Sequence, residues 1–178
     1  MSNVPPAKGT ILLVSGELDR AMAAFEVAGA FQAMGMDMSL WFLLYGANCI
    51  RKPRSRFSPA KWFRKLRGGP GRVTKTDTAL QYIIQGLNAE GANHLPLSQL
   101  NFGGLGPILL RKIMQKKQIC SLEGMIQNAH DLGVRFYICQ ICVDSMALSP
   151  EDFLYPVEVK GASSYYLDAS SSQYNVVI

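Results

Sequence analysis

Two cysteines, Cys139 and Cys142, are separated by two residues in the stretch FYICQICVDSMAL. This spacing suits a redox-active dithiol, half of a zinc site, or one reactive thiol beside an incidental neighbour. A zinc site needs four ligands. The other candidate ligands stand at no recognisable spacing from the pair: His94, His130 and Cys120. Zinc is therefore the least favoured of the three, and the dithiol and the single thiol both stay open.

Position in the fold favours Cys139 over Cys142 as a reactive thiol. The run Val134–Ile138 predicts a strand, which places Cys139 at its carboxyl end. A strand end that opens onto a short helix can stabilise a thiolate through backbone N–H groups, although Asp144 would oppose this if it lay close. A buried, inert cysteine is an equally good interpretation on these grounds, because free cysteines are commonly buried.

The amino-terminal part predicts a strand, a turn, a helix and a second strand. The apolar run at 10–15 predicts the first strand, and Gly16 follows it. Helical spacing then continues to Gly35, with alanines on a face that can pack closely against a sheet: Ala21, Ala24 and Ala28. The continuous apolar run Met38–Tyr45 fits an interior parallel strand.

The rest of the chain continues the alternation. Helices are predicted from Asp77 to about Gly91, over Ile108–Lys117 with Pro107 near the first position, and from a Ser121 cap to Gly133. The buried stripe of the last of these is predicted to be Leu122, Met125, Ile126, Ala129 and Leu132. Ser149 starts a further short helix, and a strand near Val157–Val159, a helix from Ala162 and a strand at 175–178 complete the pattern. The glycine run 101–106 fits a tight connection better than an anion cradle, because it lacks the lysine of a P-loop.

Strands that alternate with helices predict a parallel sheet covered by helices on both faces. In such sheets reactive groups lie at the carboxyl ends of the strands. The length of 178 residues and the hydrophobic content of 48% suit one domain over residues 1–178. The polar, proline-containing first residues and the lack of a long apolar run make a cytoplasmic protein the expectation. In a reducing compartment four cysteines are expected to be free thiols.

The basic residues concentrate in one segment. Ten of the eighteen Lys and Arg residues fall between Arg51 and Lys75, with no acid among them. We interpret 51–76 as a Pro/Gly-rich insertion, and a solvated loop is the favoured interpretation. The alternative is a docking element for an acidic protein or a membrane surface, with nucleic acid a less favoured partner. With two histidines and no Ser/His/Asp set, hydrolysis by acid–base catalysis has little support.

Three blocks of the sequence resemble, in order, the DsrE/DsrF-like family, and in particular its DsrE-type, peroxiredoxin-like subgroup linked to sulfur metabolism. They are GTILLVSGELDRAMAAFEVAGAFQAMGMDMSLWFLLYG, LPLSQLNFGGLGPILLRKIMQKKQICSLEGMIQNAHDLGVRFYICQICVDSMALSPEDF and VEVKGASSYYLDASSSQ. The most specific part of the resemblance is the block formed by Cys139, Gln140, Asp144 and Met146. The resemblance covers nearly everything except residues 51–76.

The resemblance implies a three-layer α/β/α sandwich, a homo-oligomer, and a carrier of sulfane sulfur or sulfurtransferase without a cofactor or metal. It assigns the reactive thiol to Cys139, which would accept sulfur from a donor such as a rhodanese or a TusA-like protein. Cys142 stands where the family usually has serine, Cys120 is a further departure, and Ala147 replaces a glycine. Either extra cysteine is a candidate second thiol. The alternatives are a binding or scaffold module that uses the basic loop, and a dithiol oxidoreductase that uses Cys139 and Cys142.

Overall fold

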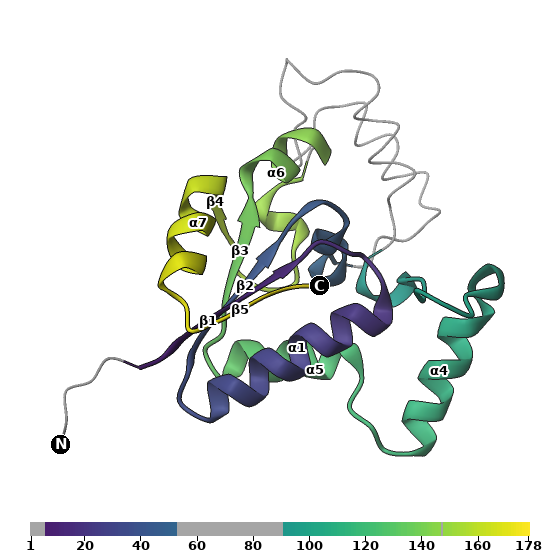
Figure 1. The fold of residues 1–178 in the computed structure, drawn as a ribbon. Coiled ribbons are helices and arrows are strands. Elements are labelled where there is room, and N and C mark those ends of the chain that lie inside the picture. Colours follow the sequence, from purple (N-terminus) through teal and green to yellow (C-terminus); the bar gives the residue numbers. More distant parts are fainter. Residues whose placement is uncertain (1–5, 53–90, 147) are drawn as a thin grey trace.

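A computed structural model describes residues 6–52, 91–146 and 148–178 (Figure 1). The predicted helix from Asp77 and all but two residues of the basic segment lie outside these ranges. Five strands form one sheet in the order β4-β3-β2-β1-β5, and all neighbouring strands are parallel. The strands are β1 Lys8–Leu13, β2 Asp37–Phe42, β3 Arg135–Cys139, β4 Glu158–Lys160 and β5 Tyr174–Val177.

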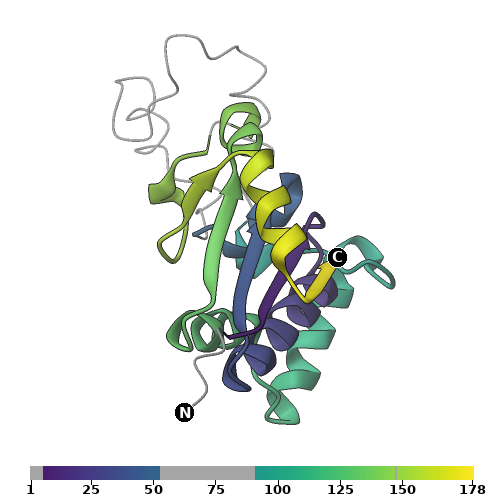
Figure 2. The same ribbon diagram turned by 60° about the vertical axis from the view of Figure 1, so that its left-hand side comes forward.

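Helices cover both faces of this sheet, as the sequence predicts. Figures 1 and 2 show α1 and α5 on one face and α7 on the other, while α4 stands to the side of the sheet. The α-helices are α1 Leu18–Ala33, α4 Leu105–Lys116, α5 Leu122–Asp131, α6 Gln140–Met146 and α7 Ala162–Ser171. The described residues also form four short 3-10 helices, η1 Leu44–Ile50, η2 Ala92–His94, η3 Phe102–Gly104 and η4 Pro150–Asp152. The predicted three-layer α/β/α architecture is confirmed.

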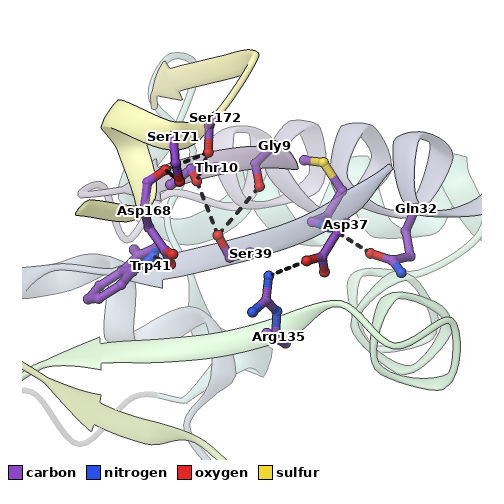
Figure 3. Close-up of polar contacts among 11 residues, drawn as sticks. Gly9, Thr10, Gln32, Asp37, Ser39, Trp41, Arg135, Asp168, Ser171 and Ser172 are labelled. Atoms are coloured by element: carbon purple, nitrogen blue, oxygen red, sulfur yellow. Dashed lines mark hydrogen bonds and ion pairs between the residues drawn. The ribbon is translucent and has the colours of Figure 1, made fainter. Parts of the chain in front are cut away.

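Neighbouring residues of β2 face opposite layers, because side chains alternate along a strand. The centre of the Phe42 ring lies 6.0 Å from the centre of the Phe25 ring of α1. The Trp41 ring lies 5.5 Å from the Tyr165 ring of α7, and its indole N–H donates a hydrogen bond to Asp168 Oδ2 at 3.2 Å (Figure 3). The continuous apolar run of this strand is therefore explained by burial on both faces.

The polar side chains beneath α7 bond to one another. Thr10 Oγ1 lies 3.2 Å from Ser39 Oγ and 2.6 Å from Ser172 Oγ, and Ser39 Oγ donates to the Gly9 carbonyl oxygen at 3.4 Å (Figure 3). Buried hydroxyl groups require such partners. We therefore assign this cluster a structural role.

Helix α1 packs closely on the sheet through its small residues. Ala21, Ala24 and Ala28 are fully buried, and the helix is followed by Gly35 at a φ of +89°, a conformation that favours glycine. The structure therefore confirms the prediction that alanines form the face packed against the sheet and the prediction that Gly35 follows the end of the helix.

Helix α5 begins at the predicted cap, since the Gly124 N–H donates to Ser121 Oγ at 3.2 Å. The predicted stripe holds for its fully buried members Leu122, Ile126 and Ala129. It is wrong for Leu132, the residue that follows the last helical position, which is 46% exposed.

Several boundaries differ from those predicted: the first strand is Lys8–Leu13 rather than 10–15, and the other strands shift by one residue or more. Two of the differences have a clear structural reason. Strand β2 ends at Phe42, because the chain then turns back over β1 as η1, with Leu43 N–H donating to Leu13 O and Gly46 N–H to Val14 O, both at 2.9 Å. Helix α4 begins at Leu105, so Pro107 is its third residue. Proline is tolerated there because the first four N–H groups of a helix have no partner within the helix.

Candidate functional site: a thiol pair at the carboxyl edge of the sheet

Cys139 is the last residue of β3, and α6 begins at the next residue. The residue is 7% exposed, so little of it meets solvent. Its partner in the parallel register with β4 is Lys160, whose ammonium group lies 3.8 Å from the centre of the Tyr137 ring. The structure therefore places Cys139 at the carboxyl edge of the sheet, where the sequence predicts it.

Cys142 lies in α6 and is fully buried. Its sulfur accepts a hydrogen bond from the Leu44 N–H at 2.8 Å, which joins α6 to the start of η1. Burial raises the pKa of the Cys142 thiol, the Leu44 N–H lowers it, and both the charge of Cys139 and a side-chain hydrogen bond with Cys139 raise it. Cys139 is therefore near enough to Cys142 to affect the pKa of its thiol, and both cysteines are free rather than bridged.

Leu44 holds its N–H toward Cys142 in a strained backbone conformation. Its φ is +48°, in the left-handed region that residues with a Cβ rarely occupy. Such strain costs roughly 1–3 kcal/mol and persists where the surrounding structure imposes it. The hydrogen bonds of Leu43 and Gly46 to the end of β1 supply that constraint on either side of Leu44.

Three other residues of the motif that resembles the family, Gln140, Asp144 and Met146, lie in α6 and have different surroundings. Gln140 Nε2 donates to Asp144 Oδ1 at 2.9 Å, and both side chains are exposed. Met146 is 6% exposed and belongs to the core. Asp144 is thus engaged on the outer side of α6, and Met146 packs inward.

A further thiol, that of Cys49, and an open pocket lie near the carboxyl end of β1, and sequence reasoning missed both. The pocket has a volume of about 340 Å³ and is lined by residues 14–17, Tyr45, Asn48 and residues 94–96. Below it Cys49 is fully buried, and its thiol donates to the Ser15 carbonyl oxygen at 3.7 Å. Burial raises the pKa of Cys49 to about 12, which keeps it protonated and unreactive. The rule that ligands bind at strand carboxyl ends, applied to β1, would have indicated this pocket.

Gly16 is required at the rim of this pocket. A Cβ atom there would lie 2.7 Å from the Tyr45 carbonyl oxygen, so only glycine lets the turn after β1 approach η1 this closely.

The structure separates Cys120 from the thiol pair. Cys120 is exposed and belongs to the connection between α4 and α5. Figures 1 and 2 show this connection at the opposite end of the molecule from α6. The two candidate second thiols therefore differ: Cys142 accompanies Cys139, and Cys120 does not.

Only Arg51 and Lys52 of the basic segment fall within the described residues. Arg51 is 2% exposed, and its Nη1 donates to Asn48 Oδ1 at 3.1 Å. The interpretation of 51–76 as a solvated loop is therefore wrong for Arg51, which pairs with Phe153 across an isolated β-bridge. Lys52 Nζ donates to the Glu151 carbonyl oxygen at 3.0 Å.

Within the part of the chain that the structure describes, no three His, Cys, Asp or Glu residues are grouped so that they could hold a metal ion. The same residues contain no helix that combines the length and apolar character of a membrane span. The chemical groups that the site offers are two neighbouring thiols and the backbone N–H of Leu44.

Comparison with known proteins gives one family and two relatives. The model of the DsrE/DsrF/DrsH-like family matches residues 6–177. The chain is 27% identical over 169 residues to the uncharacterized protein YrkE of Bacillus subtilis, with 95% of each chain covered. It is 24% identical over 166 residues to the sulfur carrier protein DsrE2 of Allochromatium vinosum, with 93% of this chain and 94% of the relative covered.

Proposed function

The chain belongs to the DsrE/DsrF/DrsH-like family, and we propose that it carries sulfane sulfur as a persulfide on Cys139. The observation that carries this proposal is the position of Cys139, a free thiol at the carboxyl end of β3 with a small exposed surface. A relative named as a sulfur carrier, aligned over most of both chains, supports the same class of function.

The transfer needs only thiol chemistry. The Cys139 thiolate attacks the outer sulfur of a donor persulfide, the donor thiolate leaves, and Cys139–S–SH forms. Transfer onward repeats the step with an acceptor thiolate. We propose that donor and acceptor are proteins of the rhodanese or TusA-like kind, and that the protein acts as a sulfurtransferase in this sense.

Sulfur loading tests the proposal directly. The protein is incubated with inorganic polysulfide, or with thiosulfate and a rhodanese, and its intact mass is measured. Wild type is expected to gain at least one sulfur atom that Cys139→Ser does not gain. Cys120→Ser, which removes an exposed thiol distant from Cys139, should load like wild type. An unmodified wild-type mass, or equal loading of Cys139→Ser, would rule out the carrier.

The proximity of Cys139 and Cys142 favours a second candidate, a dithiol oxidoreductase. That function predicts a Cys139–Cys142 bridge after mild oxidation and reduction of insulin disulfides by the reduced protein. If the protein loads sulfur but does not reduce insulin, the oxidoreductase is excluded and the sulfur carrier is retained. The binding or scaffold alternative depends on the basic segment, and deletion of residues 53–76 should abolish binding to acidic liposomes if it is correct.

We also propose that the protein self-associates through α4. Four apolar residues share one exposed face of this helix and are each more than half exposed: Leu105, Ile108, Leu109 and Ile113. A second copy of the same face would bury them by hydrophobic contact. Light scattering after gel filtration should show an oligomer for wild type and a smaller species for Leu109→Lys. A wild-type monomer would refute this assembly.

A further inference from the structure

We propose that Cys142 discharges the Cys139 persulfide as hydrogen sulfide and closes a Cys139–Cys142 disulfide. This inference rests on the proposed function, because it needs a persulfide on Cys139. It adds a product, free sulfide, and a requirement for an external dithiol that reopens the pair.

The spacing of the two residues permits the bridge. Cys139 directly precedes α6, and Cys142 is the third residue of that helix. In a capping box the residue before a helix and the third helical residue interact across the first turn, so side chains at these two positions lie within reach of each other. Small adjustments of side chain and backbone then suffice for disulfide geometry. Cys139 is also close enough to Cys142 to raise the pKa of its thiol.

The two thiols are unequally placed for loading. Cys142 is fully buried, whereas Cys139 retains a small exposed surface. Of the two residues, Cys139 is therefore the more accessible to a donor protein. Burial also raises the pKa of Cys142, so it stays a thiol and does not compete for incoming sulfur.

The Leu44 N–H provides the means to activate Cys142 at the later step. It donates to Cys142 Sγ at 2.8 Å, and a hydrogen bond to a charged acceptor is roughly twice as strong as one to a neutral acceptor. The bond therefore strengthens as Cys142 becomes a thiolate. The strained φ of Leu44 indicates that the fold holds the N–H in this direction at an energetic cost.

The reaction balances without an added oxidant. The Cys142 thiolate attacks the inner sulfur, Cys139 Sγ, and the bond from Cys139 Sγ to the outer sulfur breaks. The outer sulfur leaves with the bonding electron pair as hydrosulfide, and the Cys139–Cys142 bond forms. The sulfane sulfur is reduced to sulfide while the two cysteines become the disulfide. An external dithiol then reduces the bridge and restores both thiols for the next cycle.

The test follows sulfide and protein mass after loading. The protein is loaded with inorganic polysulfide and freed of excess reagent by gel filtration. Wild type should release sulfide, lose the added sulfur, and end two hydrogens lighter than the reduced chain. Cys142→Ser and Cys142→Ala should keep the added sulfur and release sulfide at least about tenfold more slowly. Cys120→Ser is the matched control and should behave like wild type, and circular dichroism checks that each variant is folded.

The outcomes separate this inference from the function on which it rests. Equal sulfide release by wild type and a folded Cys142 variant overturns the inference alone, as does a wild type that keeps its added sulfur. A wild type that gains no sulfur overturns the proposed function, and the inference falls with it.

Discussion

Replacement of Gly46 by alanine should destabilise the protein by about 3 kcal/mol, and the magnitude follows from the approach of η1 to β1. A Cβ atom at Gly46 would lie 2.0 Å from the Leu13 carbonyl oxygen, whereas real Cβ atoms essentially never approach closer than 3.0 Å. The two backbone segments must therefore separate by about 1 Å. Bonds that join η1 to its neighbours cannot survive such a shift intact: Gly46 N–H to Val14 O, Leu43 N–H to Leu13 O, and Leu44 N–H to Cys142 Sγ. Each is worth about 1 kcal/mol, so their loss gives the total.

Urea denaturation followed by circular dichroism measures this effect. A loss of about 3 kcal/mol corresponds to a fall in Tm of roughly 6–12 °C for a chain of this size. Gly29→Ala is the matched control, since its Cβ would meet nothing nearer than Leu132 Cδ1 at 4.0 Å. In the interior of α1 that change should stabilise the fold by roughly 0.5–1 kcal/mol. A Gly46→Ala protein within about 0.5 kcal/mol of wild type would refute the backbone contact from which the magnitude is derived.

Two further predictions concern burial and capping. Between pH 9 and 12 the folded chain keeps a proton on Cys49 that the unfolded chain releases, because burial raises the pKa from its ordinary 9.0 to about 12. The stability advantage of wild type over Cys49→Ala is therefore complete below pH 9 and should fall by up to about 4 kcal/mol as the pH rises through this window, measured by urea denaturation at several pH values. A constant difference would contradict the burial of this thiol. Ser121→Ala removes the cap of α5 and should cost about 1 kcal/mol, whereas Ser121→Asp, which can also accept the Gly124 N–H, should recover most of it.

Local sequence signals predicted most elements of the fold because each is short-range. The alanine face of α1 and the Ser121 cap depend on neighbours within a few residues, and the structure has both. The end of β2 depends instead on the contact of Gly46 with β1, more than thirty residues earlier in the chain. No local pattern encodes that contact, and the predicted strand consequently ran three residues too far.

The candidate site, like the fold, was predictable from the sequence only where local signals determine it. The position of Cys139 at a strand end follows from one apolar run and the behaviour of parallel sheets, so the sequence predicts it. The partner of Cys142 is a backbone N–H at Leu44, far away in the chain, and a backbone group leaves no mark in the residue types. The burial of Arg51 was missed because a basic residue beside other basic residues is expected to be solvated, whereas its neighbours in space are Asn48 and Phe153.

The bond between Leu44 and Cys142 would couple η1 to the proposed closure of the thiol pair. Residues of η1, Tyr45 and Asn48, also line the pocket at the end of β1. The proposed closure would change Cys142 Sγ, the acceptor of this bond, from a thiol to a disulfide sulfur, and with it the restraint on the strained Leu44 and on the residues that follow it. Thermodynamic reciprocity then applies. Any molecule that binds the pocket more tightly in one state of the pair shifts the reduction potential of Cys139 and Cys142 by the same free energy.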